Sequence, residues 1–356
     1  MPSSVSVLSD SFFSCWKSPS NIALIKYWGK TGNQIPANAS LSITLSEAYT
    51  LTRIKTNPVT GSKGPEVVFR FEGEVNEAFG ARIESFLKSV VPYFSFLKDV
   101  SLEIESGNNF PHSAGIASSA SAMSAMALCL CSIESEVTGV EVSQQAFLQK
   151  ASFISRIGSG SACRSVYGGM AVWGSHEAVE GSVNEYAVPL SFEPDPLFSD
   201  IRDTILIVDP GQKKISSSVG HNLMRGHAYA PARFNQAASN LTALLLALRQ
   251  GDWETFALIT ENEALSLHAM MMTSMPGYLL IHPNSLKIIE KVIDFRKQSG
   301  SAVCFTLDAG PNVHLLYPAR DLEKILPLIE ELKEHCYHGT AIEDKMGSGP
   351  EKLKCR

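Results

Sequence analysis

The sequence of 356 residues lacks the features that would assign it to a membrane, disulfide-rich or zinc-binding class. Its seven cysteines are an odd number, none forms a CxxC pair, and no HExxH motif occurs, so neither a disulfide framework nor a metal-ligating cluster is expected. No apolar run reaches the ~18–20 residues that cross a bilayer. The N-terminal segment MPSSVSVLSDSFFSCWK has no basic n-region and no apolar core of signal-peptide length. We expect a cytoplasmic protein in a reducing compartment, without a membrane partner.

An excess of positive charge is also missing. The 30 Lys and Arg residues face 36 Asp and Glu residues, which gives a formal net charge of −6. This balance argues against a general nucleic-acid-binding protein. A local cluster of basic residues can still hold a small anionic substrate.

The composition is that of an ordinary globular protein, with 44% hydrophobic and 19% charged residues, and the length suggests two domains. The segment LSFEPDPLFSD, residues 190–200, is the best boundary, because two prolines and three acidic residues separate apolar segments there. We predict domains at 1–195 and 196–356.

Strand and helix patterns alternate irregularly in both halves. The first half contains the strand-like segments VVFRFEG and SLEIES, and the second half has predicted strands at 204–208, 302–307 and 313–318. Helices are predicted over 79–90, within 111–130, and over 143–156, 235–249, 252–270, 284–297 and 320–335. Because strict βαβ alternation is absent, an α+β fold is favoured in both halves.

The segment PHSAGIASSASAMSAMALCL, residues 111–130, predicts a helix whose first turn carries only small side chains. The first N–H groups of a helix have no partner within the helix, and the helix dipole attracts anions to that end. A phosphate reaches these groups only where no bulky side chain blocks the approach. The alternative is a helix that needs small residues for close packing. The segment GKT at 29–31 is not a phosphate-binding Walker A loop, because Leu24 stands where that loop requires glycine.

Two further stretches carry basic and hydroxyl groups. In SPSNIALIKYWGK, residues 18–30, Lys26 and Lys30 flank two aromatic residues and form a candidate anion clamp; the alternative is an edge strand with solvated lysines. In SRIGSGSACRSVYGG, residues 155–169, glycines accompany the hydroxyls of Ser159 and Ser161 and the guanidinium of Arg164. Arginine binds carboxylate or phosphate through two parallel hydrogen bonds.

A carboxylate completes the candidate site. Asp308 follows a predicted buried strand and precedes an Ala-Gly-Pro turn. Strand ends are rigid supports for reactive groups. The alternative is an aspartate that only stabilises the turn.

Five segments, spread from residue 21 to 312, together resemble the signatures of the mevalonate diphosphate decarboxylase family of the GHMP kinase superfamily, in the same order. These segments are NIALIKYWGK, PANASLSITL, NNFPHSAGIASSAS, IGSGSACRSVYGG and TLDAGPN. The resemblance implies a two-domain GHMP kinase-like α+β fold, with a half like ribosomal protein S5 domain 2, a ferredoxin-like half, and the active site in the cleft between them.

The resemblance also implies roles for individual residues. Asp308 is similar to the catalytic carboxylate that faces the substrate C3 hydroxyl, with Lys26, Arg164 and Asn21 in the same catalytic group. Tyr27, Lys30, Ser159, Ser161 and Arg164 resemble the contacts to the mevalonate moiety and its diphosphate, and the segment KKISSS, 213–218, resembles one that enters the site from the second domain. The residues that resemble the ATP phosphate loop are Ser113, Ala114, Gly115, Ile116, Ala117, Ser118, Ser119, Ala120 and Ser121.

The implied reaction converts mevalonate 5-diphosphate and ATP into isopentenyl diphosphate, ADP, phosphate and CO2. Hydroxide is a poor leaving group, and phosphorylation of the C3 oxygen makes a good one. ATP is thus a co-substrate, and Mg²⁺ is expected with no protein ligand assigned. The partners implied are small molecules and a second copy of the chain in a homodimer. The alternatives are a decarboxylase of mevalonate monophosphate, a small-molecule kinase that stops at the 3-phosphate, and a catalytically silent ATP-binding regulator.

Overall fold

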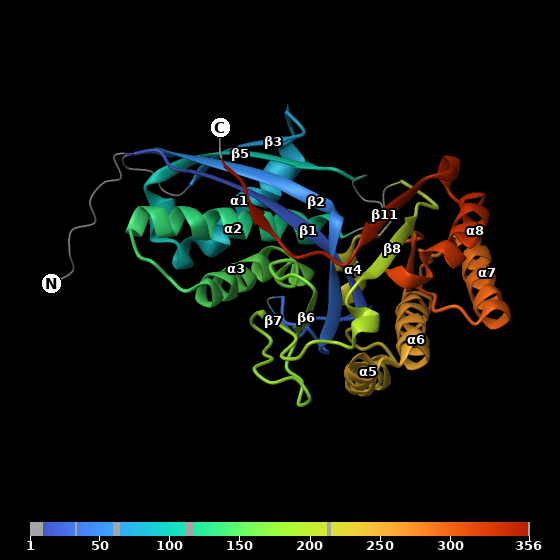
Figure 1. Ribbon diagram of the computed structural model, residues 1–356. Coiled ribbons are helices and arrows are strands. Elements are labelled where there is room, and N and C mark those ends of the chain that lie inside the picture. The colour runs from blue at the N-terminus through green and yellow to red at the C-terminus, as the bar shows by residue number, and fades with distance from the viewer. Residues whose placement is uncertain (1–9, 33, 60–64, 111–116, 212–214, 355–356) are drawn as a thin grey trace.

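Two β-sheets with helices packed against them make up the computed structural model of the chain (Figure 1), which describes residues 10–32, 34–59, 65–110, 117–211 and 215–354. The larger sheet contains β1 Phe13–Ile25, β2 Ser40–Pro58, β3 Glu66–Phe71, β4 Glu74–Val75, β5 Val100–Asn108, β6 Met170–Trp173, β7 Ala187–Pro189 and β12 Glu351–Lys352. The smaller sheet contains β8 Ile201–Leu206, β9 Cys304–Thr306, β10 Val313–Pro318 and β11 Ala341–Lys345.

The larger sheet has the order β12-β1-β2-β5-β3-β4, and β6 and β7 extend it from β2. Its strand pairs are antiparallel except for β3 and β5, which run parallel. The helices α1 (Glu77–Val90), α2 (Ser118–Thr138) and α3 (Gln144–Gly158) lie together along one side of this sheet (Figure 1). α2 packs directly on β1 and β2, which makes it the central helix of this half.

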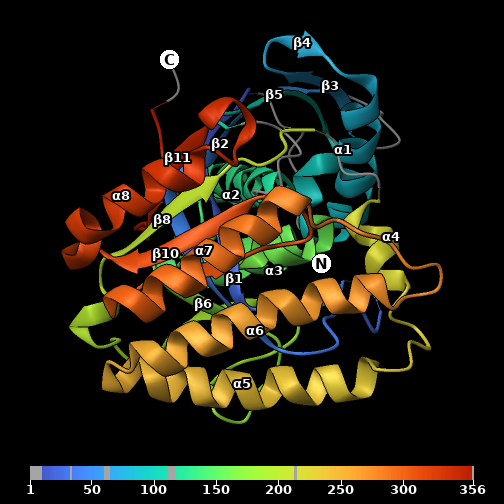
Figure 2. The ribbon, with the colours of Figure 1, turned by 90° about the vertical axis from the view of Figure 1, so that its right-hand side faces the viewer.

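The smaller sheet has the order β11-β8-β10-β9 and is entirely antiparallel. The helices of the second half form an outer layer that faces the viewer in Figure 2, where α5 and α6 run side by side. These helices are α4 Ser217–Asn222, α5 Ala230–Gln250, α6 Trp253–Met272, α7 Pro283–Ser299 and α8 Leu322–Lys333. One hydrophobic cluster joins the halves, since it contains residues of β1 and β2 as well as of α5, α6 and β8.

α2 combines a small, polar first turn with a long apolar body. In the described part of the chain it is the single helix that is long and apolar enough to cross a membrane, and 72% of the apolar stretch is buried inside the protein. Met126, Leu128 and Leu130 are each at most 1% exposed. This burial is what a core helix of a folded domain requires.

The helices and strands predicted from sequence periodicity are confirmed, with ends displaced by a few residues. Local hydrogen bonds account for several helix starts: the side chain of Asn76 caps α1, Ser143 caps α3 and Asp252 caps α6. α5 and α7 end at Gly251 and Gly300, whose φ values of 71° and 66° are readily adopted by glycine. The same cues explain why these elements could be recognised without tertiary information.

The C-terminal segment, which has no predicted element, joins the two sheets. β11 pairs with β8 at one edge of the smaller sheet, and β12 pairs with β1 at one edge of the larger sheet. Between them Gly347 lies so close to β2 that a Cβ atom would stand 2.3 Å from the carbonyl oxygen of Leu45. Gly349 has a φ of 101°, in the region that favours glycine. The GSGP segment is therefore a tight connection that passes over β2.

Asp344 anchors this connection. Its carboxylate accepts hydrogen bonds of 2.8 Å from three consecutive backbone N–H groups, those of Ser46, Glu47 and Ala48. Asp344 is only 5% exposed, so water cannot replace the bonds if the carboxylate is lost.

We expect Asp344→Ala to lower the free energy of unfolding by about 3 kcal/mol, because three buried N–H groups lose a charged acceptor. Glu343→Ala is the matched control, since Glu343 is exposed on the same strand. Its effect should stay within about 0.5 kcal/mol. Urea unfolding of both variants measures the difference. Equal stabilities would mean that the Asp344 carboxylate does not anchor the C-terminal segment.

Candidate active site

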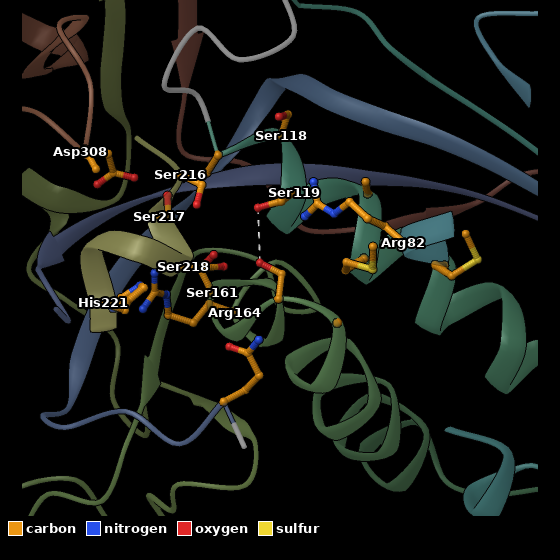
Figure 3. A pocket seen from close by; sticks show the side chains of 18 of the residues that line it. Arg82, Ser118, Ser119, Ser161, Arg164, Ser216, Ser217, Ser218, His221 and Asp308 are labelled. Carbon is orange, nitrogen blue, oxygen red and sulfur yellow. Dashed lines mark hydrogen bonds between the residues drawn. The ribbon is translucent and has the colours of Figure 1, made fainter. Parts of the chain in front are cut away.

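A cavity of about 400 Å³, called the central cavity below, opens between residues of the two halves. Its walls come from the end of β1, the start of α2, the segment after α3, the start of α4, and the loop after β9. Figure 3 shows Ser118 and Ser119 at the start of α2, with Asp308, His221 and Arg164 to one side and Arg82 to the other. The predicted residues that line the cavity are Lys26, Tyr27, Lys30, Ala117, Ser118, Ser119, Ser159, Ser161, Arg164 and Asp308.

A lysine and an aspartate that are 282 residues apart meet at the cavity wall. The Nζ atom of Lys26 donates a hydrogen bond of 2.8 Å to Oδ1 of Asp308. Lys26 is 2% exposed, whereas the Asp308 side chain is 25% exposed and reaches the cavity. Burial lowers the pKa of Lys26, and the neighbouring Asp308 carboxylate counteracts part of that effect. The pair places an accessible carboxylate beside a buried ammonium group.

Arg164 is held by residues behind it. Its Nη2 and Nε atoms donate hydrogen bonds of 3.1 and 3.3 Å to Oδ1 of Asn21, and Nη1 donates to the hydroxyl of Ser40. The Nδ2 atom of Asn21 donates in turn to the hydroxyl of Ser165 over 2.7 Å. Asn21 is 3% exposed and does not line the cavity. Among the sequence-predicted catalytic residues, Asn21 therefore supports Arg164 rather than facing the cavity.

The start of α2 has the shape that a phosphate site requires. Ala117 precedes the helix with φ 49° and ψ 40°, and its methyl side chain cannot cap the first N–H groups. Ser119 points towards the segment after α3, where its hydroxyl lies 3.2 Å from the hydroxyl of Ser159 (Figure 3). The predicted phosphate-loop residues Ser113, Ala114, Gly115 and Ile116 lie outside the described residues.

Two further residues of the predicted phosphate loop, Ala120 and Ser121, do not line the cavity. Both are fully buried, and the Ser121 hydroxyl lies 2.6 Å from the hydroxyl of Thr50 on β2. Successive residues of a helix point in directions about 100° apart, so these two side chains face the sheet while Ser118 and Ser119 face the cavity.

The central cavity is strongly cationic although the whole protein is acidic. Lys26, Lys30, Arg82 and Arg164 line it, and Asp308 is the single carboxylate among its described lining residues. Burial lowers the pKa of Lys30 to about 8, and burial also lowers the pKa of Arg164. A polyanion with several negative charges is the ligand that such a cavity attracts.

A second, apolar compartment lies beyond the start of α2. Arg82 stands at this compartment in Figure 3. Its apolar and aromatic walls suit a flat heterocycle, and the guanidinium of Arg82 adds a cation to the lining. The periodicity of α1 gave no sign that Arg82 faces a ligand site, because charged residues on an exposed helix face are usually solvated. The apolar residues that line this compartment are Phe69, Phe71, Phe79, Ile83, Met123 and Met126.

α4 brings further residues that were not predicted individually. Ser216, Ser217 and Ser218 line the cavity, as expected for the KKISSS segment, whose residues 213 and 214 lie outside the described part of the chain. His221 also lines it, and its Nδ1 atom accepts a hydrogen bond of 3.0 Å from the N–H of Gly29. Burial, followed by the charge of Lys30, holds the pKa of His221 well below its usual value of 6.5. The ring is therefore neutral, with its proton on Nε2.

Two family models together match most of the chain. The model described as the diphosphomevalonate decarboxylase-like N-terminal domain matches residues 18–184. The model described as the mevalonate 5-diphosphate decarboxylase C-terminal domain matches residues 204–353. The unmatched residues between them contain the predicted boundary at 195, and the division at that residue stays a prediction.

The chain is 30% identical over 319 residues to the diphosphomevalonate decarboxylase of Homo sapiens, covering 83% of this chain and 74% of the relative. Its fold matches the mevalonate diphosphate decarboxylase of Staphylococcus aureus with a TM-score of 0.82 at 28% identity, covering 98% and 100% of the two chains. It also matches a structure described as MDDEF in complex with MVAPP, AMPPCP and magnesium, with a TM-score of 0.82 at 27% identity, covering 97% and 100%. The α+β arrangement of two sheets is thus the GHMP kinase-like fold, and the chain belongs to the diphosphomevalonate decarboxylase family.

Proposed function

We propose that the chain catalyses the ATP-dependent decarboxylation of mevalonate 5-diphosphate to isopentenyl diphosphate, with release of ADP, phosphate and CO2. The observation that carries the proposal is the Lys26–Asp308 pair. It supplies the one carboxylate among the described lining residues of a cationic cavity, across from the start of α2. A carboxylate in that position can accept a proton from a hydroxyl group, while cations hold the phosphates on either side.

ATP occupies the part of the central cavity around the start of α2 in this proposal. The phosphates approach the N–H groups of the first turn, and the hydroxyls of Ser118 and Ser119 donate to them. The apolar compartment beside Arg82 receives the base, because its aromatic and methionine side chains offer flat apolar contacts. The γ-phosphate then points from α2 towards the side of the cavity that holds Asp308.

The mevalonate diphosphate occupies the other part of the cavity. Lys30 and Arg164 provide charge for its diphosphate and carboxylate, with hydroxyl donors from Tyr27, Ser159 and Ser161. Burial raises the pKa of Tyr27, so its phenol remains a hydrogen-bond donor.

The chemistry follows from this arrangement. Asp308 orients or accepts the proton of the C3 hydroxyl, whose oxygen attacks the γ-phosphorus of ATP and displaces ADP. The C3–O bond to the new phosphate then breaks, and phosphate leaves with the electron pair. The bond between the carboxylate carbon and C2 supplies the electrons of the new alkene, so CO2 is released and charge balances. Lys26 forms an ion pair with Asp308 and adds positive charge near the transferred group.

Mg²⁺ is expected with ATP, and the described lining of the cavity fits a metal carried by the nucleotide. The described residues contain no group of three or more His, Cys, Asp or Glu side chains arranged for a metal. Mg²⁺ commonly keeps several waters and binds phosphate oxygens with only one or two protein oxygens. The hydroxyls of Ser118 and Ser119 are the protein oxygens that would hold it, and the ion would supply charge neutralisation at the phosphates.

Assembly and localisation are further parts of the proposal. Exposed apolar side chains on α5 and α6, among them Leu246, Leu258 and Leu265, support a homodimer that covers them. The six cysteines of the described residues are free thiols, which supports a reducing cytoplasmic compartment.

The first activity prediction concerns the substrate. We expect kcat/KM for mevalonate diphosphate to exceed that for the monophosphate by about 100-fold or more, because a lost phosphate leaves charge-assisted hydrogen bonds to Lys30 and Arg164 unmade. A coupled assay of ADP release, with CO2 trapped, measures turnover of mevalonate and its two phosphates. Equal or faster turnover of the monophosphate supports the alternative decarboxylase, and ADP release without CO2 supports the kinase.

The second prediction concerns the start of α2. Ser119 is exposed, so Ser119→Leu should fold normally while its side chain blocks the helix N-terminus, and ATP turnover should be lost. Ser119→Ala should be milder, with a loss of about tenfold for one hydrogen bond to a charged group. Steady-state kinetics with varied ATP test both variants. If Ser119→Leu folds and turns over ATP normally, the start of α2 does not bind phosphate, and its small residues serve only packing.

The third prediction separates a reactive carboxylate from a turn-forming one. Asp308→Asn keeps the shape but loses the charge, so kcat should fall by roughly 10²–10⁴-fold with little change in substrate KM. Asp195→Asn is the matched control, because Asp195 caps a turn through a 2.9 Å bond from the N–H of Leu197. Its kcat should stay at the wild-type value. Retained kcat in Asp308→Asn, with an unchanged thermal midpoint, would assign Asp308 to the turn alone.

A further inference from the structure

The backbone N–H and the carbonyl group of Lys26 are both hydrogen-bonded to side chains of residues that lie later in the chain. Its N–H donates a hydrogen bond of 2.8 Å to Oε2 of Glu263 on α6. Its carbonyl oxygen accepts hydrogen bonds of 3.3 Å from Nη2 of Arg233 on α5 and of 3.0 Å from Nδ2 of Asn38. The peptide groups that carry the Lys26 side chain are thus fixed by two helices of the second half.

Glu263 and Arg233 form a buried ion pair. They are 0% and 4% exposed, and Nη1 of Arg233 lies 3.1 Å from Oε1 of Glu263 while Nη2 contacts Oε2. Asn240, two turns after Arg233 on α5, donates to Oε1 of Glu263 over 2.7 Å. An ion pair of this kind adds little net stability over apolar residues of the same volume. The hydrogen bonds of both residues to the Lys26 backbone therefore indicate that the pair holds this backbone in place.

We infer that Glu263 and Arg233 are positioning residues for catalysis: they hold the peptide of Lys26 so that its ammonium group stays on Asp308. β1 ends at Ile25, so no strand pairing fixes the Lys26 peptide. Glu263 and Arg233, together called the clamp below, supply the missing constraint from α6 and α5. The clamp couples the packing of the two halves to the geometry of the reaction. This inference rests on the function proposed above.

The charge of Glu263 also acts on the Lys26 ammonium group. The charged groups around Lys26 are Asp308, Glu263, Arg164 and Arg233, together with Asp203 on β8. Burial raises the pKa of Asp203, and the charge of Lys26 opposes that effect. Asp308 and Glu263 raise the pKa of Lys26 against the larger effect of burial. The clamp therefore acts in two separable ways, through a hydrogen bond and through a charge.

Glu263→Asp tests the hydrogen bond. The shorter side chain keeps the charge but cannot reach both Arg233 and the N–H of Lys26. We expect kcat to fall at least about tenfold, since a displacement of ~1 Å in a catalytic group can cost 10²-fold. KM for ATP and for mevalonate diphosphate should change less than about threefold, because neither residue lines the cavity.

Glu263→Gln tests the charge. It retains an oxygen that can accept from Lys26, but removes the anion that favours the ammonium form. The pKa of Lys26 should fall. In a plot of kcat against pH, the decrease on the alkaline side should therefore move to lower pH by about one unit. This decrease should stay in place in Glu263→Asp, which keeps the charge.

Glu261→Asp and Glu261→Gln are the matched controls. Glu261 lies on the same helix, is 7% exposed, and forms a partly buried pair with Arg296 over 2.5 and 2.8 Å, without a hydrogen bond to Lys26. These variants should lose comparable thermal stability and keep kcat within about twofold of wild type. An equal loss of kcat in both pairs would assign Glu263 a merely structural role, and kcat near wild type in Glu263→Asp would overturn the clamp.

Two further measurements keep the inference testable. Hydrogen exchange of the Lys26 amide, followed by NMR, should accelerate in Glu263→Asp and not in Glu261→Asp, and this readout does not depend on any enzymatic activity. If the wild-type protein releases no CO2 from mevalonate diphosphate, the proposed function is wrong. If the Lys26 amide exchanges at the same rate in Glu263→Asp as in the wild type, the clamp is overturned. Should Glu263→Asp not fold, Arg233→Lys keeps the positive charge and loses the contact with the Lys26 carbonyl; wild-type kcat in that variant would also overturn it.

Discussion

A lysine ammonium group buried at the junction of the two halves is the constraint on which the active site depends. Lys26 is 2% exposed, and a buried cation is stable only when an anion and hydrogen-bond acceptors surround it. The first half supplies the lysine, and the second half supplies the carboxylates of Asp308 and Glu263. The two halves must dock for the cation to be compensated, so the cavity forms only in the folded whole.

The distribution of charge explains how an acidic protein accommodates two polyanionic substrates. Excess acidic residues lie elsewhere in the chain, while four cations and one carboxylate occur among the described residues of the cavity wall. Cations in a confined site with low-dielectric walls attract anions more strongly than the same cations in water. Phosphoryl transfer needs mainly this positioning and neutralisation, together with the helix N-terminus.

Rigidity in this site comes from residues that do not reach the substrate. Asn21 and Ser40 orient Arg164, and Glu263 with Arg233 fixes the backbone of Lys26. These supporting groups are buried and hydrogen-bonded, so they leave the charged groups little freedom to rotate away from the cavity. The cationic groups are therefore arranged before the substrates arrive, which reduces the reorganisation needed during the reaction.

The sequence by itself determined the longer helices and five of the described strands, because periodicity, caps and glycine stops are local. Its motifs identified the main cavity-lining groups. Only the tertiary structure decided which of them face the cavity: Ala120 and Ser121 follow Ser119 along the chain but point into the core. It also decided where Arg82, His221 and Glu263 lie, and these residues carry no local signal. Their positions depend on contacts between segments up to 237 residues apart, and such contacts leave no periodic pattern in a single sequence.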